Sequence, residues 1–360
     1  MSRIKVGVIG VGWGQLQLES LYRAQDMHVV ALCDTNSAQL ETVAQKYKIR
    51  QTFTDYRELV AQKDVDLVSV AAPPECHREM VKAAINAGKH VLVEKPIALD
   101  LLDARALLRA AESKRVVHAV DFEMRFLPAL AYTKELIAEG YLGSLLRADV
   151  TMGVERPWGE HGNWAAEDAR GGGILNELGS HFIDAILWWF GDARAVLAQR
   201  QTWFPTVKLP TYDAKLKDTI LVKKPVTADD AFWCMIQFAS GGEAMLNFVT
   251  GARHDVGWSI SVYGTAGTLV VRDGGLLGKR DVDREMAILP IPKRLELGDS
   301  PKDPLMWSMA RLAECMAAKI NRGKDLKSFP DFCDGWAVAS VIDAIHRSSD
   351  ARAWANVEKL

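Results

Sequence analysis

The first third of the chain alternates short apolar runs with amphipathic stretches. The apolar runs read as buried β-strands; they are Ile4–Ile9, His28–Cys33, Leu67–Ala71, His90–Glu94 and Val116–Val120. Between them lie helical patterns, including Ser37–Tyr47, Glu75–Ala87 and Leu102–Lys114. Regular alternation of strand and helix predicts a parallel sheet built from right-handed crossovers. We therefore expect residues 1–122 to form a doubly wound α/β domain.

The pattern changes after Asp121. A predicted helix, Leu127–Glu139, and a strand near Leu145–Met152 lead to a polar and aromatic loop, and then to a helix over Leu178–Phe190. Several predicted strands follow: Val196–Thr202, Ala231–Phe238, Glu243–Thr250, Trp258–Tyr263 and Gly267–Arg272. No helix separates the last four, so we expect antiparallel pairing. Two helices, about Pro304–Arg322 and Phe332–Ser349, close the chain. Residues 123–360 are thus expected to form an α+β domain with a large, mostly antiparallel open sheet.

The proline-punctuated stretch from Phe204 to Thr227 predicts a long loop or arm. A sheet with one face bare of helices is a natural oligomer surface, which favours a homodimer or homotetramer.

Composition narrows the class of protein. A length of 360 residues suggests two domains. A net charge of −2 and the lack of a basic run argue against nucleic acid. The 5 cysteines are scattered without a C-x-x-C pair, so no disulfide framework or zinc site is expected, and no metal is required. No apolar run is long enough for a membrane span, and the N-terminus runs directly into a strand. We expect a cytoplasmic protein without a membrane partner.

A glycine-rich turn follows the first strand: Gly10-Val11-Gly12-Trp13-Gly14-Gln15. Such a turn lets a pyrophosphate approach the backbone at a helix N-terminus. The usual third glycine or alanine is replaced by Gln15, with a glycine one residue earlier at Gly14. We expect Trp13 to lie along the cofactor or to cover it.

Asp34 ends the second predicted strand, 24 residues after Gly10. A carboxylate there accepts hydrogen bonds from the ribose hydroxyls of NAD and repels the 2′-phosphate of NADP. The sequence therefore predicts NAD as cofactor. The alternative is that Asp34 is a loop residue or the N-cap of the next helix.

Three further segments of the first domain are candidates for the cofactor side of the site. Ala72 and Pro73 end the third main strand, and His77 lies in the following helix, where capping or packing near the cofactor is expected. Glu94-Lys95-Pro96 ends a buried strand at the sheet edge where ligands bind; the alternative is an ordinary solvated strand end. Arg125 lies just after the domain crossing and is expected to orient a ligand or to tie the domains together.

The second set of candidates follows the run Gly171-Gly172-Gly173 and comprises Asn176, Glu177 and His181. Residues four apart share a helical face, so Glu177 can orient the imidazole of His181 or bind a substrate hydroxyl. Histidine suits general-base catalysis because its unperturbed pKa lies near neutrality. The alternative is a histidine satisfied by backbone groups at a helix N-terminus.

The loop before the glycine run is expected to provide walls for the substrate. Trp158, His161 and Trp164 are its candidate residues. Aromatic faces pack against the apolar C–H groups of a ligand while polar groups take its hydroxyls. Interface packing or ordinary loop structure is the alternative.

These landmarks together resemble the glucose-fructose oxidoreductase, inositol dehydrogenase and rhizopine-catabolism family (Gfo/Idh/MocA). The matching segments, in order, are the glycine turn, Ala72-Pro73-Pro74-Glu75-Cys76-His77, Glu94-Lys95-Pro96, Arg125-Phe126-Leu127-Pro128, and the segment from Gly171 to Asp184. The resemblance implies an N-terminal Rossmann domain, a C-terminal sheet that mediates dimers or tetramers, and hydride transfer between a nicotinamide and a secondary alcohol of a sugar or cyclitol. It also implies that Lys95 and His181 flank the reacting carbon. The family has an aspartate where this chain has Glu177.

The expected activity is therefore oxidation of a ring hydroxyl of a sugar, sugar derivative, glycoside or cyclitol by NAD. His181 is the expected base, Lys95 the electrostatic partner of the reacting oxygen, and Glu177 the orienting group or a substrate ligand. One alternative is a tightly bound NAD that cycles within one turnover, for glycoside cleavage or sugar-to-sugar redox exchange. Another is a non-catalytic NAD-binding regulator, which would be expected to lack the lysine–histidine pair.

Overall fold

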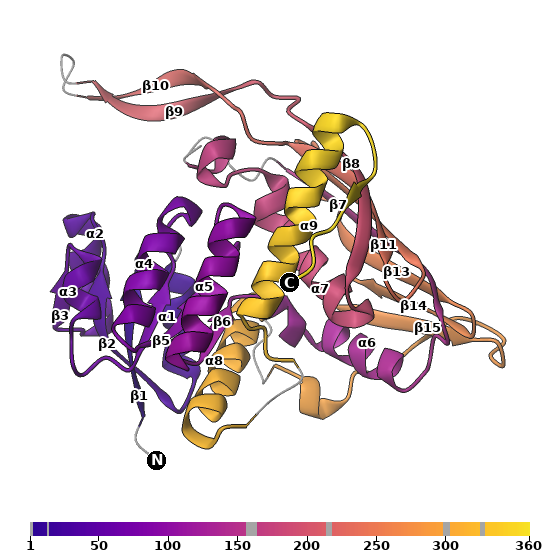
Figure 1. The fold of residues 1–360 in the computed structure, drawn as a ribbon, viewed down its shortest axis with the longest axis horizontal. Helices are drawn as coiled ribbons and strands as arrows, with labels where there is room; N and C mark the ends of the chain where they lie inside the picture. Colours follow the sequence, from indigo (N-terminus) through magenta and orange to yellow (C-terminus); the bar gives the residue numbers. More distant parts are fainter. Residues whose placement is uncertain (1–2, 13, 156–163, 214–217, 298–302, 325–327) are drawn as a thin grey trace. The chain divides into compact units, whose positions relative to one another are not determined.

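The computed structural model describes residues 3–12, 14–155, 164–213, 218–297, 303–324 and 328–360. The chain folds into two compact units. The first contains residues 1–128 and 294–339, and the second contains residues 129–293 and 340–360. Each unit has its own sheet (Figure 1).

The first unit is built on a parallel sheet of six strands in the order β3-β2-β1-β4-β5-β6. The strands are β1 Ile4–Ile9, β2 Met27–Cys33, β3 Gln51–Phe53, β4 Leu67–Val70, β5 His90–Val93 and β6 His118–Val120. Its helices are α1 Gly14–Arg23, α2 Ser37–Tyr47, α3 Tyr56–Val60, α4 Pro74–Asn86, α5 Leu101–Lys114 and α8 Pro304–Arg322. The strand order reverses between β1 and β4, which is the switch point where ligands bind in doubly wound folds. The doubly wound fold class is confirmed.

The first unit also takes in α8, which the sequence boundary at 122/123 assigned to the second domain. The Ser20 hydroxyl of α1 donates to the Met306 carbonyl at 2.9 Å. Leu312 and Met316 of α8 belong to the same hydrophobic cluster as Leu18. The amphipathic pattern predicted α8 correctly, but a helical pattern does not specify which distant sheet its apolar face will cover.

The second unit is organised around a nine-stranded sheet in the order β16-β15-β14-β13-β7-β12-β11-β8-β17. The strands are β7 Leu145–Val154, β8 Ala193–Gln201, β11 Ala231–Phe238, β12 Glu243–Thr250, β13 Gly257–Gly264, β14 Gly267–Arg272, β15 Gly275–Arg280, β16 Ala287–Ile288 and β17 Ala355–Asn356. All neighbours pair antiparallel except β7 and β12, which are parallel. The mostly antiparallel open sheet is confirmed. Antiparallel pairing of consecutive strands holds for β11–β12 and β13–β14, but β7 lies between β12 and β13.

The remaining elements complete the chain. The helices are α6 Pro128–Ala138, α7 Ser180–Phe190 and α9 Phe332–Ala351, and the short helical turns are η1 Glu123–Phe126, η2 Trp164–Ala166, η3 Asp168–Arg170, η4 Leu175–Gly179 and η5 Lys293–Leu295. The expected arm is a two-stranded ribbon of β9 Thr206–Asp213 and β10 Asp218–Pro225, which extends away from the large sheet of its unit (Figure 1). Within the described residues, no helix combines the length and the apolar character needed to cross a membrane.

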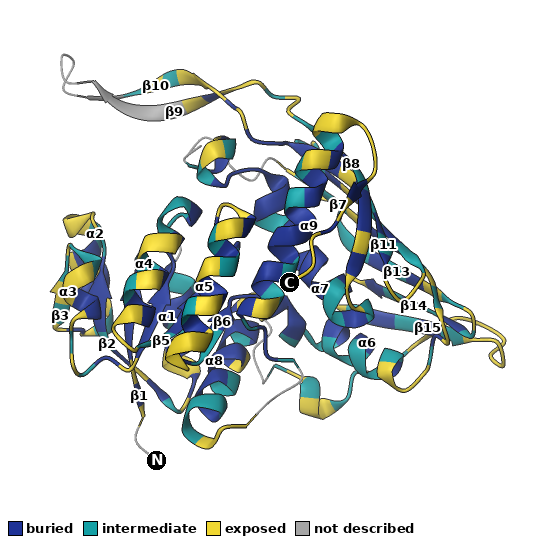
Figure 2. Ribbon diagram, viewed as in Figure 1, coloured by how far each residue is buried: buried dark blue, intermediate teal, exposed yellow. Residues whose placement is uncertain are grey.

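Burial alternates along the strands of the large sheet (Figure 2). In β11, Phe232, Cys234 and Ile236 are buried, whereas Trp233 is 36% exposed. One face of the sheet therefore packs into the core of the second unit, and the other carries partly exposed side chains.

Candidate active site

The glycine turn lies at the carboxyl end of β1. Gly10 has φ +91°, and a Cβ at this position would lie 2.5 Å from the Ala71 carbonyl oxygen. Only glycine adopts this conformation in so little space. Its N–H donates to the Cys33 carbonyl at 2.8 Å, which joins the ends of β1 and β2.

The turn fits the pyrophosphate of a dinucleotide. Gly12 is exposed, and among the described residues a Cβ added there would meet only Gln39 Nε2, at 4.0 Å, so the backbone is open to close approach. Helix α1 begins at Gly14 with no acidic residue in its first turn, so its N-terminal dipole is available to an anion. Gln15, in place of the usual third glycine, is the second residue of this helix.

Asp34 organises the turn from the end of β2. Its Oδ2 accepts from the Val11 N–H at 2.8 Å, and its Oδ1 accepts from the Asn36 N–H at 2.8 Å. The N-cap of α2 is Asn36, not Asp34. Carboxylate oxygens accept more than one hydrogen bond, so these contacts leave capacity for ribose hydroxyls.

His77 links two loops at the carboxyl edge of the sheet. One ring nitrogen lies 2.8 Å from the Ala72 carbonyl oxygen, and the other lies 2.8 Å from that of Pro96. The side chain has no exposed surface, and burial lowers its pKa. Any effect of His77 on a cofactor must therefore pass through the Ala72-Pro73 loop or the loop after Lys95.

Lys95 follows β5 and is joined to Pro96 by a cis peptide. The preceding Glu94 is not a solvated strand end, because it is only 5% exposed and its Oε1 accepts from Gln17 Nε2 at 2.9 Å. The same Gln17 nitrogen donates to Asp121 Oδ2 at 2.8 Å, and Ser69 Oγ donates to Gln17 Oε1 at 2.5 Å. The segment that carries Lys95 is thus supported by a buried polar network.

Two further carboxyl groups, those of Asp121 and Glu123, are buried and respond to the Lys95 charge. Asp121 and Glu123 are 1% and 4% exposed. Burial, followed by the charge of neighbouring carboxylates, raises the pKa of both well above the usual range, while the Lys95 charge opposes that rise. The neighbouring charge on Asp121 comes from Glu94, and that on Glu123 comes first from Asp121. We did not identify Gln17 or Asp121 from the sequence, although Asp121 directly follows a strand adjacent to β5.

Arg125 is 2% exposed and lies in η1. Its Nη2 lies 2.8 Å from Asp334 Oδ1, at the start of α9. This ion pair joins the end of the contiguous part of the first unit to the segment that returns to it at residues 294–339.

The candidates of the second unit lie in a π-helical turn, η4, that runs directly into α7. Asn176 and Glu177 belong to the π-turn, and His181 is the second residue of α7. Asn176 Nδ2 donates to the Gly172 carbonyl at 3.3 Å, and Ser180 Oγ donates to the Asn176 carbonyl at 2.7 Å. His181 is 6% exposed. Single π-turns within helices are rare overall, and those that occur are often found at functional sites.

Asp229 holds the start of this helical segment. Its backbone carbonyl accepts from the Ile174 N–H, and its Oδ2 accepts from the Leu175 N–H, both at 3.0 Å. Gly173 has φ +103°, and a Cβ there would lie 2.4 Å from Asp229 Oδ1, so the glycine run lets the chain pass close to this carboxyl. Burial raises the pKa of Asp229 to about 6, against the opposing effects of the Leu175 hydrogen bond and the Arg200 charge.

Arg200 of β8 completes this anchor. It bonds Asp168 Oδ1 at 3.0 Å and lies 3.6 Å from Asp229 Oδ1. The sequence analysis identified neither Arg200 nor Asp229 as part of the site. The sequence signal for Asp229 was weak, because an acidic residue just before a buried strand is also common in ordinary turns.

Trp164 begins η2 and is partly buried. The other aromatic and histidine candidates, Trp13, Trp158 and His161, lie outside the described residues. No group of His, Cys, Asp and Glu within the described ranges has the arrangement of a metal site.

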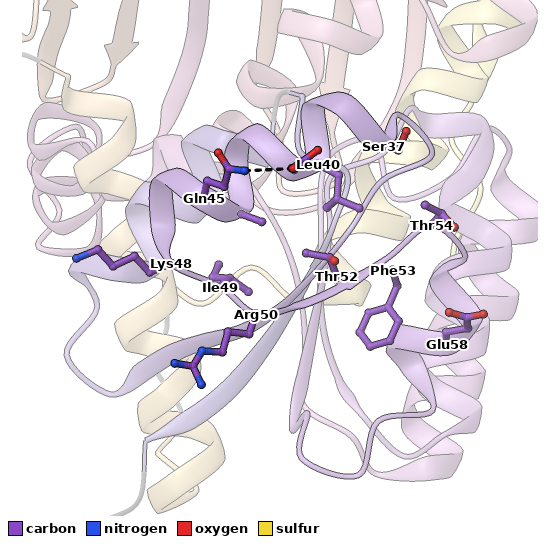
Figure 3. A pocket seen from close by; sticks show the side chains of 12 residues that line it. Ser37, Leu40, Gln45, Lys48, Ile49, Arg50, Thr52, Phe53, Thr54 and Glu58 are labelled. Carbon is purple, nitrogen blue, oxygen red and sulfur yellow. Dashed lines mark hydrogen bonds between the residues drawn. The ribbon is translucent and has the colours of Figure 1, made fainter.

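A hollow opens at the edge of the first unit's sheet, between α2 and β3 (Figure 3). Ser37, Lys48, Arg50 and Glu58 are among its polar lining residues, and Gln45 donates to Glu41 at 3.2 Å on its rim. None of the residues that line it belongs to the candidate site.

Known proteins resemble the chain along almost its whole length. Residues 4–122 match the model described as the oxidoreductase family with an NAD-binding Rossmann fold, GFO_IDH_MocA. Residues 130–270 match the GFO/IDH/MocA C-terminal domain.

Two curated relatives illustrate the similarity. An uncharacterized oxidoreductase of Synechocystis sp., sll0816, is 29% identical over 368 residues, which cover 99% of this chain and 97% of that protein. Levoglucosan dehydrogenase of Pseudarthrobacter phenanthrenivorans is 26% identical over 399 residues, which cover 100% of both. A solved structure of levoglucosan dehydrogenase in complex with NADH and L-sorbose superposes with a TM-score of 0.87 at 25% identity, with 100% of both chains covered.

Proposed function

The chain belongs to the Gfo/Idh/MocA family of oxidoreductases, and we propose that it is an NAD-dependent dehydrogenase that oxidises a secondary ring hydroxyl of a sugar, sugar derivative, glycoside or cyclitol to a ketone. The observation that carries the proposal is the π-turn that presents Asn176 and Glu177 immediately before His181, in a chain whose other unit has an NAD-binding Rossmann fold. The relative that acts on levoglucosan and the neighbour that binds L-sorbose support a carbohydrate substrate.

In this proposal each residue has a defined task. His181 takes the hydroxyl proton as general base. Lys95 donates a hydrogen bond to the reacting oxygen and favours its alkoxide character. Glu177 orients the imidazole or binds a neighbouring substrate hydroxyl. NAD, when bound, supplies the acceptor for the hydride that leaves the carbinol carbon, so the alcohol loses one proton and one hydride.

The residues that would bind the cofactor belong to the first unit. The turn from Gly10 to Gln15 holds the pyrophosphate, and Asp34 accepts from the ribose hydroxyls. The loop at Ala72 and Pro73, at the end of β4, borders the same edge of the sheet. Repulsion between Asp34 and a 2′-phosphate makes NAD the preferred cofactor.

The experiment is a screen of sugars, glycosides and cyclitols for NADH absorbance, followed by His181→Ala on the best substrate. We expect turnover to fall by roughly 10²–10⁴-fold, the range for loss of general-base catalysis, with NAD binding retained. His254→Ala is the matched control, because His254 is exposed and lies outside the candidate site. Near-normal turnover of the His181 variant would refute its assignment as base.

The same screen separates the alternative functions. Cofactor that co-elutes with the protein, with no net NADH formed, would indicate redox cycling within one turnover. NAD binding without turnover of any compound would indicate a regulator, if that binding is also unchanged when Lys95 or His181 is substituted.

The proposed partner, besides the substrate, is a second copy of the chain. Trp233 and Tyr263 are 36% and 40% exposed on strands of the large sheet. Met235, on the same strand as Trp233, lies opposite Met245 of β12, and both methionines are partly exposed. Covering such a face in a homodimer or homotetramer removes apolar surface from water. A monomer at micromolar concentration in sedimentation velocity would end this part of the proposal.

A further inference from the structure

The buried network behind Lys95 places two carboxyl groups, those of Glu94 and Asp121, on one amide nitrogen of Gln17. Glu94 follows β5, Asp121 follows β6, and Gln17 lies in α1, whereas Glu123 lies in η1. When ionised, carboxyl groups only accept hydrogen bonds, so the Gln17 amide must turn its NH₂ toward Glu94 and Asp121. The Ser69 hydroxyl then donates to the remaining Gln17 oxygen. Both amide hydrogens of Gln17 are therefore used.

The shared donor also brings two carboxyl groups together. Glu94 Oε1 and Asp121 Oδ2 lie within 2.9 Å of the same nitrogen, so they approach to about 5 Å of each other around a planar amide. Asp121 Oδ1 is fully buried and receives no hydrogen bond from the described residues. Like charges at such a distance, away from water, do not ionise together at neutral pH, and their protons come off as a coupled set.

The ammonium of Lys95, the residue after Glu94, carries a positive charge that acts on this set. Its charge lowers the pKa of Asp121 and of Glu123, so its ammonium lies within electrostatic reach of both. His77 is also near Lys95, but it is fully buried between two carbonyl oxygens, and the Lys95 charge further lowers its pKa. Asp121 and Glu123 therefore supply negative charge within electrostatic reach of the Lys95 ammonium.

We propose that Glu94, Asp121 and Glu123 form a buried carboxyl cluster that retains a shared proton at neutral pH and positions the Lys95 ammonium through its remaining negative charge. The three acids and Gln17 are positioning residues, since they act through Lys95. The inference rests on the proposed role of Lys95 only for its effect on turnover. The shared proton does not depend on that role, because all three acids belong to the first unit.

The test is an infrared titration of the carboxylic acid C=O band between pH 5 and 9 on the full chain. In the wild type we expect a protonated carboxyl band that persists at pH 7. In Asp121→Asn the two remaining acids lose a like-charged neighbour, so ionisation moves to lower pH by about one unit. In Lys95→Met the cluster loses its cation, so ionisation moves to higher pH. Asp229, in the second unit, provides a band that is unchanged in every variant.

Asp100→Asn is the matched control, because Asp100 is an exposed N-cap of α5 and asparagine caps a helix equally well. If Asp121→Asn fails to fold, Glu123→Gln carries the same expectation. Identical titrations of the wild type and the Asp121 variant would overturn the shared proton, and a titration unmoved by Lys95→Met would overturn the link to Lys95.

Turnover gives the second readout. If ionisation of the cluster acts on Lys95, the pH–rate profile of Asp121→Asn changes its shape, whereas a merely structural defect lowers the rate by the same factor at all pH values. If the infrared shifts occur but no carbohydrate is oxidised, the cluster stands and the proposed dehydrogenase activity fails. If turnover is found but the infrared shifts are absent, the proposed function stands and the cluster fails.

Discussion

The carboxyl of Asp229 makes the stability of the second unit depend on pH, and Asp229→Asn isolates that dependence. Asp229 is 2% exposed, and burial raises its pKa from 3.8 to about 6. Asparagine keeps an oxygen that can accept from the Leu175 N–H, and Arg200 keeps its bond to Asp168. The substitution therefore removes a titrating group while it retains most of the local hydrogen bonding.

The direction of this pH dependence follows from proton linkage. The folded state binds this proton more tightly than the unfolded chain does, so the contribution of Asp229 to the free energy of unfolding is fully present below pH 3.8 and is lost as the pH rises through about 6. The full loss is about 3 kcal/mol, from a pKa difference of about two units. About 1.4 kcal/mol of it falls between pH 5 and pH 7.5. The asparagine variant lacks this loss.

Urea unfolding followed by tryptophan fluorescence at pH 5, 6 and 7.5 measures the effect. The stability of Asp229→Asn relative to wild type should rise by about 1.4 kcal/mol across that range, whatever its value at pH 5. Asp192→Asn, at an exposed site of the same unit, should show a difference that does not change with pH. A constant or falling difference for the Asp229 variant would show that its carboxyl does not titrate as the burial argument requires.

Two further substitutions test the cofactor side. The wild type should prefer NAD over NADP by at least tenfold in kcat/KM, worth about 1.4 kcal/mol, and Asp34→Ser should abolish that preference. Equal use of both cofactors by the wild type would contradict a ribose role for Asp34. Gly10→Ala should destabilise the first unit by about 2–5 kcal/mol, because it combines a positive φ with a Cβ placed 2.5 Å from the Ala71 carbonyl oxygen. An unchanged thermal unfolding midpoint for that variant would contradict the close approach.

Much of the fold could be predicted from local patterns. The boundaries of β12 and β14, and of α8, are those that the apolar periodicity indicated. The glycine turn and Asp34 were also recognisable, because the conformations and charges that they supply are needed at one short segment of chain. The order of strands in the large sheet was not recognisable, since the insertion of β7 between β12 and β13 depends on a pairing more than ninety residues apart in the sequence.

The candidate site divides in the same way. Residue type and spacing were enough to single out Lys95, Glu177 and His181, because lysine, carboxylate and imidazole have their chemistry wherever the chain places them. The surroundings of these residues were decided by tertiary structure. Gln17 meets Asp121 across 104 residues, and Asp229 meets Leu175 across 54. A carboxyl group in the sequence is an ordinary acid, and only burial beside other charges, which the folded chain alone provides, changes its affinity for a proton.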